Sequence, residues 1–443
     1  MSLFSRRIFS ILSSQAVILV ISLATGIFLS RSLGKELKGQ FDLVSTFAAT
    51  AGVVLNLGIG AALIYYTNRN VEDRNNVISS AFFLQFISAL IGVAALLLAH
   101  AYIQGVILQN KVTELLVYIG MVITPLATIS SLLYNLLVGL TEFGKYNVIR
   151  VTQNLALLVG CILLVGALSL GVLGALSAIV LANLIVVLLS HFWLRQNGYH
   201  LSLYPSRRWI KSIVAYGSKS WLGYLLQFMN LRLDIFLVNF FLNTGAVAIY
   251  SVAVAISETL WYLPTSISTV LFPKTATDWE KAKNFTPLVV RTTLVISILC
   301  AIAMALFGKP VIRMAYGEQF APAIAPLVAI LPGTVMLGIG KIISTDLAGL
   351  GKPQYGTWGS AISLVLTIIF DIWLIPIFGA TGAALASTIS YGINTLILVL
   401  LYIRHSGNQL SSLILIQKVD WEVYQRLFKS YRMTMLSGLF SRK

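Results

Sequence analysis

Residues 172 to 194 read VLGALSAIVLANLIVVLLSHFWL, an unbroken apolar stretch without Asp, Glu, Lys or Arg. As a helix, a stretch of this length is about 35 Å long, slightly more than the ~30 Å hydrocarbon core of a bilayer. The apolar residues are continuous and do not alternate with polar ones, which argues against a strand of a membrane β-barrel. The stretch therefore predicts a helix that spans a membrane.

Eleven further stretches of this kind fill most of the 443-residue chain. The composition agrees, with 58% hydrophobic residues and 10% charged residues, against about 25% charged in soluble proteins. We predict an all-α integral membrane protein with about 12 transmembrane helices and no sizeable soluble domain. The predicted spans are 11–30, 40–66, 77–101, 115–140, 147–169, 172–194, 219–242, 246–272, 287–307, 321–344, 355–376 and 380–403.

The net charge of +16 comes from basic residues that lie between the predicted spans. If the N-terminus is cytoplasmic, twenty-four of the 31 Lys and Arg residues fall in cytoplasmic segments and six in outer segments. Membrane proteins place Lys and Arg preferentially on the cytoplasmic side. The charge pattern therefore predicts a multi-pass protein of the plasma membrane with both termini cytoplasmic, and it gives no reason to expect nucleic-acid binding.

Short motifs recur at a nearly constant offset, which indicates an ancestral duplication of six helices. Because six is even, both halves would start on the same side of the membrane, as two six-helix bundles related by an axis along the membrane normal. We predict bundles at 1–194 and 219–403, a cytoplasmic linker at 195–218 and a basic amphipathic cytoplasmic tail at 404–443. The recurring segments, at offsets of 208 to 210, are 33–41 with 242–250, 139–140 with 349–350, and 171–175 with 379–383.

Catalytic chemistry finds little support in the sequence. The four histidines stand beside no acidic partner and lack metal-ligand spacing. The Gly-Lys pairs at 340–341 and 351–352 lack the Ser or Thr that a phosphate-binding loop requires. We therefore predict that the chain is not an enzyme and holds no metal.

Ionisable residues inside spans are the main functional candidates, because burying a charge in a membrane is expensive. Arg232, Asp234 and Glu258 fall near the middle of the seventh and eighth spans. Residues two apart point about 200° apart on a helix, so one of Arg232 and Asp234 should face a central cleft and the other its own bundle. An internal ion pair of Arg232 with Glu258 is the structural alternative.

Three further charged residues lie nearer the predicted outer boundary and are expected to line an outer vestibule. They are Arg31, Asp42 and Asp371.

The sequence resembles bacterial polysaccharide flippases over about residues 5 to 403. The segments that carry the resemblance are FLSRSLGKELKGQF at 28–41, LGIGA at 57–61, RLDIFL at 232–237, AIYSVA at 248–253 and LFP at 271–273. The resemblance implies a V-shaped pair of bundles from the superfamily that includes lipid II flippases and multidrug extruders.

Family members carry undecaprenyl-diphosphate-linked oligosaccharides between leaflets, so we expect a polyprenyl-diphosphate-linked oligosaccharide as substrate. Arg232, with Arg31, Asp42 and Asp371, is expected to bind it. Asp234 or Glu258 would bind a coupling proton or sodium ion, with no other cofactor. The resemblance allows a polysaccharide polymerase and glycosyltransferases as partners. The alternatives are a multidrug or metabolite extruder of the same fold and a nontransporting scaffold for polysaccharide assembly.

The predicted topology can be tested with single cysteines at positions 70, 200 and 280, on a background without the native cysteines. Because all three positions are predicted to be cytoplasmic, they should resist membrane-impermeant thiol reagents in intact cells and react after the cells are opened. Rapid labelling of all three in intact cells would overturn the topology.

Overall fold

The structure, a computed structural model, describes residues 3–70, 72–199, 204–277, 279–415 and 417. Every regular element in these residues is a helix, so the predicted all-α membrane fold is confirmed. The predicted amphipathic segment after residue 417 lies outside the described residues. The elements are α1 (Leu3–Asn56), α2 (Ile59–Arg69), α3 (Arg74–Leu98), α4 (His100–Tyr102), η1 (Ile103–Ile107), α5 (Glu114–Gly139), α6 (Phe143–Cys161), η2 (Ile162–Ala167), α7 (Gly171–Gln196), α8 (Arg207–Phe241), α9 (Thr244–Glu258), η3 (Thr259–Trp261), α10 (Tyr262–Thr277), α11 (Trp279–Tyr316), η4 (Glu318–Ala323), α12 (Ile324–Gly349), α13 (Gln354–Phe378), α14 (Ala380–Ser406) and α15 (Leu410–Ile414).

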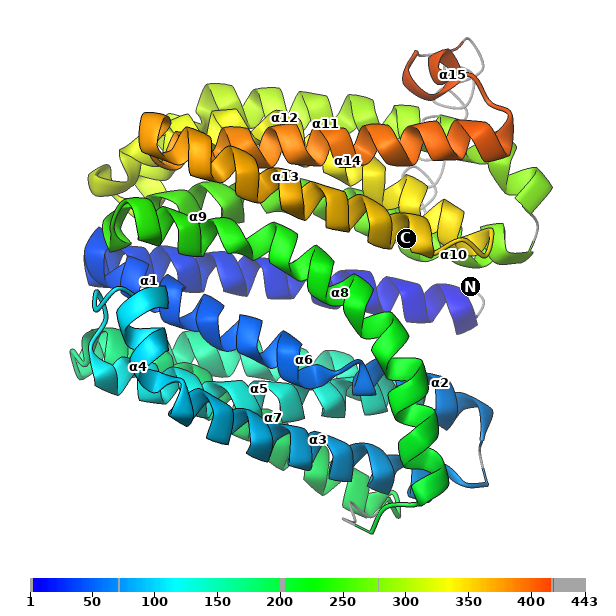
Figure 1. Cartoon of the computed structure of the whole chain (residues 1–443), viewed down its shortest axis with the longest axis horizontal. Coiled ribbons are helices and arrows are strands. Elements are labelled where there is room, and N and C mark those ends of the chain that lie inside the picture. The colour runs from blue at the N-terminus through cyan, green and yellow to red at the C-terminus, as the bar shows by residue number, and fades with distance from the viewer. Residues whose placement is uncertain (1–2, 71, 200–203, 278, 416, 418–443) are drawn as a thin grey trace, which may run out of the picture.

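Helix α1 is two helices joined at Gly34. A straight helix of its 54 residues would be about 80 Å long, more than twice the thickness of the hydrocarbon core. Gly34 interrupts it with φ 74° and ψ 173°, a conformation that glycine adopts without the steric cost of a Cβ. In Figure 1 the blue chain runs from the N-terminal end across the molecule and then back. The two predicted spans at 11–30 and 40–66 therefore lie on either side of this break.

Ten described helices or helix pairs are long and apolar enough to cross a membrane, which makes this a multi-pass membrane protein. This count takes α1 as one element and does not include α8, which contains the predicted span 219–242. The total of twelve spans stays a prediction.

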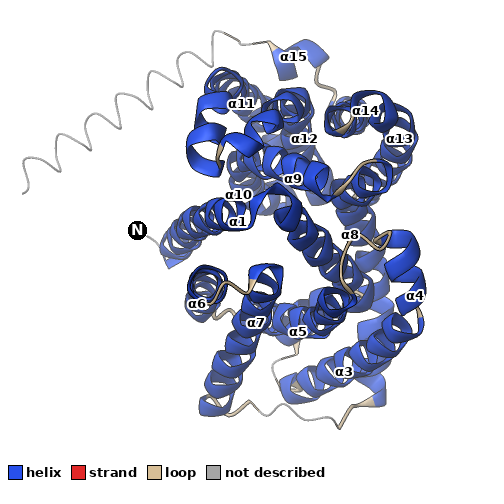
Figure 2. Ribbon diagram, turned by 90° about the vertical axis from the view of Figure 1, so that its left-hand side faces the viewer, coloured by secondary structure: helices blue, strands red, loops and turns tan. Residues whose placement is uncertain are grey.

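The first and second halves of the chain form separate layers. Figure 1 shows α2 to α7 in its lower part and α10 to α14 in its upper part, and Figure 2 shows the same division from a second direction. The recurring motifs occupy corresponding positions. Gly139 ends α5 as Gly349 ends α12, and Gly171 begins α7 as Gly379 precedes α14, both with φ near 60°. This correspondence supports the duplication, while the symmetry axis stays a prediction.

The predicted linker at 195–218 is not one continuous loop. Helix α7 ends at Gln196 and α8 begins at Arg207, so fourteen of the predicted linker residues are helical, twelve of them at the start of α8. They form a helix because Trp209, Ile213 and Tyr216 follow one another at helical spacing and pack on the first half, with Trp209 and Ile213 buried. Basic residues interrupt the apolar ones in this segment, so the sequence alone did not indicate this apolar helix face. The rest of α8 joins the second half, where Asn230 accepts a hydrogen bond from Thr367 at 3.0 Å.

One close contact between the two halves lies at one end of the molecule, where Gly39 of α1 meets Thr244 of α9. A Cβ added to Gly39 would lie 1.7 Å from the carbonyl oxygen of Thr244, so only glycine allows this approach. Close to this point, the Thr244 hydroxyl donates to the Glu36 carboxylate at 3.3 Å.

Two basic side chains strengthen the contact by donating to backbone carbonyls of the opposite half. The Arg31 guanidinium donates to the carbonyl of Ala315 at 2.7 Å and also to that of Met314, at the C-terminal end of α11. The Lys111 ammonium donates to the carbonyl of Leu242 at 3.0 Å, just after α8. Cations suit such positions because the last carbonyls of a helix lack partners and carry partial negative charge. We call these contacts, together with Gly39–Thr244, the Gly39 end.

The Gly39 contact can be tested by comparing Gly39→Ala with Gly26→Ala on the same helix. A Cβ at Gly26 meets nothing within 4 Å, so that variant should keep or slightly raise stability through its better helix propensity. The added methyl at Gly39 must push α1 from α9, and overpacking of this kind costs about 1–3 kcal/mol. Gly39→Ala should therefore unfold at a lower temperature in detergent. Equal unfolding temperatures for the two variants would contradict the close contact.

Candidate functional site

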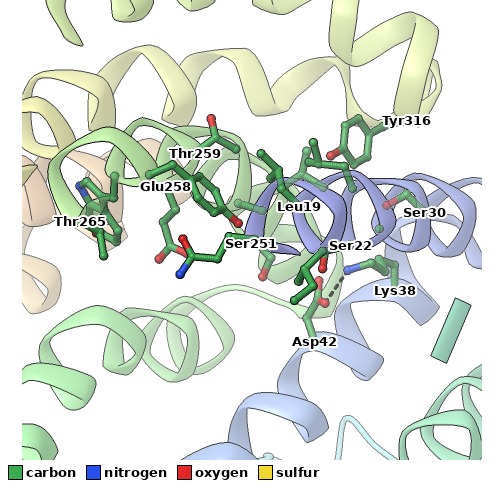
Figure 3. Close-up of a pocket in the computed structure, with 18 of the residues that line it drawn as sticks. Leu19, Ser22, Ser30, Lys38, Asp42, Ser251, Glu258, Thr259, Thr265 and Tyr316 are labelled. Carbon is green, nitrogen blue, oxygen red and sulfur yellow. Dashed lines mark hydrogen bonds and ion pairs between the residues drawn. The ribbon is translucent and has the colours of Figure 1, made fainter. Parts of the chain in front are cut away.

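A cavity of about 450 Å³ lies between the two halves. The first half contributes α1 and Arg150 of α6, and the second contributes α9, η3, α10 and Tyr316 of α11. Figure 3 shows its hydroxyl and charged side chains around the N-terminal part of α1. We call it the main cavity. Its polar lining residues are Gln15, Ser22, Ser30, Lys38, Asp42, Arg150, Ser251, Glu258, Thr259, Trp261, Tyr262, Thr265 and Tyr316.

The charges that line the main cavity are balanced and partnered. Lys38 and Asp42, one helical turn apart on α1, form an ion pair, drawn as a dashed line in Figure 3. Arg150 donates to the hydroxyl of Tyr146 at 2.9 Å. Glu258 lies toward the other side of the view from Lys38. The cavity thus offers two cations and two anions, which suits a ligand with many hydroxyl groups better than a simple cation.

Arg232 and Glu258 form the internal ion pair that was expected as the structural alternative to a functional role. The two guanidinium nitrogens of Arg232 donate to the two carboxylate oxygens of Glu258 at 2.7 and 3.1 Å, a bidentate geometry that is among the stronger pairings of these groups. Their side chains keep 30% and 23% exposure. Glu258 lines the main cavity, whereas Arg232 stands behind it on α8. The guanidinium is therefore held by an acid of its own protein.

Asp234 faces into the second half, away from Arg232, as the helical spacing predicted for one of the two. It is buried, and it accepts hydrogen bonds from the Tyr250 hydroxyl, from the Ser387 hydroxyl at 3.3 Å and from the Ile235 amide at 2.9 Å. Three elements, α8, α9 and α14, thus meet at this carboxylate.

Two residues expected in an outer vestibule lie elsewhere. Asp371 is fully buried on α13, and neither carboxylate oxygen has a hydrogen-bond partner among the described residues. It is buried because α13 turns this face toward α8 and α14 and not toward a vestibule, and its charge is near enough to interact with that of Asp234. Arg31 is exposed, but its donors are used on the carbonyls of α11. Of the three, Asp42 alone lines the main cavity.

Lys38 and Arg150 line the cavity, although the sequence analysis does not name them. Lys38 falls between the predicted spans 11–30 and 40–66, but its position four residues before Asp42 is a signal for a pair on one helix face. Arg150 falls near the end of the predicted span 147–169, and the packing of α6 against α1 brings it to the cavity.

Comparison with known proteins shows which family this sequence belongs to. A family model described as "Polysaccharide biosynthesis protein" matches residues 4–279, more than half of the chain. The chain belongs to this family. A similar curated protein is the "Probable low-salt glycan biosynthesis flippase Agl15" of Haloferax volcanii, 22% identical over 377 residues that cover 84% of this chain and 77% of that protein.

Solved structures show the same fold at low sequence identity. The lipid II flippase MurJ in an inward closed conformation superposes with a TM-score of 0.76 at 16% identity, covering 98% of this chain and 99% of that chain. An inward-facing multidrug resistance transporter of the MATE family superposes with a TM-score of 0.71 at 16% identity, covering 88% and 94%. By their names, the Haloferax relative and the two solved structures are flippases or transporters, and none is named as an enzyme.

The Arg232–Glu258 pair makes a prediction for a double-mutant cycle. Each single alanine variant leaves one charge without its partner inside the membrane, so each should lower the free energy of unfolding, measured by SDS titration in micelles. Arg232→Ala/Glu258→Ala should recover about 1–3 kcal/mol relative to the sum of the single losses. All three variants should lose transport, because the edge of the main cavity has changed. Additive stability losses would contradict the pairing, and a double variant that transports normally would make the pair purely structural.

Proposed function

We propose that the chain moves a polyprenyl-diphosphate-linked oligosaccharide across the plasma membrane, for the synthesis of a surface polysaccharide, by alternating access. The observation that carries this proposal is the main cavity, a polar space between two membrane-embedded halves that are joined at the Gly39 end. Family membership and the name of the Haloferax relative support the substrate class. No covalent bond need be broken, because the two halves would open the cavity first at one side of the membrane and then at the other.

The main cavity suits the sugar part of such a substrate. Hydroxyl and amide groups line it, including Gln15, Ser22 and Thr259, and these can donate to and accept from sugar hydroxyls. The polyprenyl tail can stay in lipid while only the polar part enters. Both termini would lie in the cytoplasm, so the Gly39 end would face outward. Glycosyltransferases would supply the substrate, and a polysaccharide polymerase would consume it.

Ion coupling would use Asp234 and not Glu258. Glu258 is neutralised by Arg232, whereas Asp234 lies in a buried polar cluster and interacts with the charge of Asp371. Two carboxylates in one buried region favour uptake of a proton or a sodium ion, because the cation removes their mutual repulsion. Binding of that cation within the second half is how we expect a gradient to drive the change between the two states.

The charge balance of the main cavity favours a flippase over an extruder of the same fold. An extruder of small cations would be expected to offer unpaired acidic groups, yet Asp42 is paired with Lys38 and Glu258 with Arg232. A nontransporting scaffold would not need a polar cavity between the halves.

A deletion strain that lacks other members of the family tests the proposal. It should lose a surface polysaccharide and accumulate the lipid-linked repeat unit on the cytoplasmic leaflet, and the wild-type gene should reverse both effects. Unchanged polysaccharide together with increased drug susceptibility would favour the extruder. Full complementation by a variant with Arg232, Asp234 and Glu258 all replaced by alanine would favour the scaffold.

A further inference from the structure

A second cavity, of about 360 Å³, lies within the second half of the chain. Residues of α10, α12, α13 and α14 line it, together with Gln227 of α8. Thr265 lines both this cavity and the main cavity, so the two adjoin along α10. We call it the Lys341 cavity, after the charged residue on its wall.

Lys341 is a cation without an ionic partner. Its ammonium lies 3.8 Å from the centre of the Trp261 ring, and it makes no hydrogen bond or ion pair with the described residues. Glu258 is the acid whose charge acts on it, but the carboxylate of Glu258 is already held by Arg232. A cation–π contact compensates only part of the cost of keeping an ammonium inside a membrane.

The other cations at cavity walls are all engaged. Lys38 is paired with Asp42, and Arg150 donates to Tyr146. Arg232, which is expected from the sequence to bind the substrate, is held by Glu258. Lys341 is therefore the cation best placed to accept an anionic ligand among those that the structure describes.

The rest of the Lys341 cavity is polar and carries no acidic residue. Asn394, which is 4% exposed, contributes an amide group. The Ser268 hydroxyl is buried and has no hydrogen-bond partner among the described residues, so it can donate to a ligand. A wall with one cation, hydroxyl and amide groups and no carboxylate fits an oxyanion, because hydroxyls and amides can donate to it. The remaining polar lining residues are Gln227, Thr265, Ser344, Thr345 and Ser360.

Neighbouring contacts hold the Trp261 ring, on which the Lys341 ammonium rests, in place. The Trp261 indole donates to the carbonyl of Thr334 at 2.9 Å, and its ring lies 6.4 Å from the ring of Tyr391. Both Trp261 and Tyr391 are buried. The surface on which the ammonium rests is thus fixed before any ligand arrives, which lowers the entropy cost of binding.

We propose that the Lys341 cavity is a binding site for a phosphate group, with Lys341 as its cation. Under the proposed function, this group is the diphosphate of the lipid carrier, held beside the main cavity that takes the sugar. The phosphate site itself follows from the cavity and does not depend on which glycan is carried.

Binding of farnesyl diphosphate and of inorganic diphosphate to the purified protein in phosphatidylcholine nanodiscs tests this site. Lys341→Gln removes the charge and keeps a hydrogen-bonding side chain, while Lys341→Arg keeps the charge. Lys309→Gln, which removes an exposed lysine, is the matched control. A charge-assisted hydrogen bond contributes about 1.5–3 kcal/mol, so Lys341→Gln should weaken binding about tenfold or more. Lys341→Arg and Lys309→Gln should bind within a few-fold of wild type.

Gln227→Glu provides a second variant if Lys341→Gln does not fold. It changes the shape of the cavity little, keeps Lys341 and adds an anion to the wall, so it should also weaken binding about tenfold or more. Tighter binding of farnesyl diphosphate than of inorganic diphosphate would assign the site to a lipid-borne phosphate. Equal binding that is lost in both variants would assign it to phosphate whatever its carrier.

The site is wrong if wild-type protein binds neither probe, or if folded Lys341→Gln and Gln227→Glu bind both probes as wild type does. These results are independent of the glycan. Diphosphate binding that needs Lys341, in a protein whose deletion leaves surface polysaccharide intact, would remove the proposed function and keep the site. Polysaccharide loss on deletion, with unchanged binding in both variants, would exclude the phosphate site and keep the proposed function.

Discussion

The approach of Gly39 to the backbone of Thr244 is the contact on which the arrangement of the two halves depends. It brings α1 and α9 together without intervening side chains, and it places Arg31 and Lys111 within reach of carbonyls on the opposite half. Because these contacts join the halves at one end, the polar lining of the main cavity is enclosed there. Alternating access requires that the same contacts can separate. A close glycine contact and a few hydrogen bonds suit this end because they can break and form again.

Inside the membrane, two ion pairs border the main cavity, whereas Lys341 and Asp371 form no ion pair with the described residues. Lys38 with Asp42 and Arg232 with Glu258 pair cations with acids, so they can line or border a wet cavity at modest cost. Lys341 rests on an aromatic ring, and Asp371 is buried without a hydrogen-bond partner among the described residues. In the second half, Lys341 supports the proposed anionic ligand, and the buried carboxylates of Asp234 and Asp371 support the proposed coupling cation at a separate site.

The sequence predicted the all-α membrane fold because a continuous apolar stretch has few structural solutions in lipid. It also predicted the opposite directions of Arg232 and Asp234, which follow from helix geometry alone. It also predicted a turn between the spans at 11–30 and 40–66, where Gly34 breaks α1, but it did not predict the helix at 207–218 or the burial of Asp371. Each of these depends on which face meets a neighbouring helix, and local periodicity does not identify the neighbour. The sequence does not single out Arg150 or Lys341 for the same reason, since depth along a span does not show whether a residue faces a cavity.

The most direct test of the account is a reversible cross-link across the Gly39 end. Lys35 and Gln319 are exposed there, and the Lys35 amide donates to the Gln319 side chain at 3.3 Å. Lys35→Cys/Gln319→Cys protein that lacks the native Cys161 and Cys300 is joined by a short bifunctional thiosulfonate reagent. It can be assayed in proteoliposomes for movement of a fluorescent lipid-linked oligosaccharide between leaflets. The account predicts that cross-linked protein does not transport and that reduction restores the uncross-linked rate, while each single-cysteine protein is unaffected by the reagent. Transport at the full rate by cross-linked protein would contradict alternating access through this end.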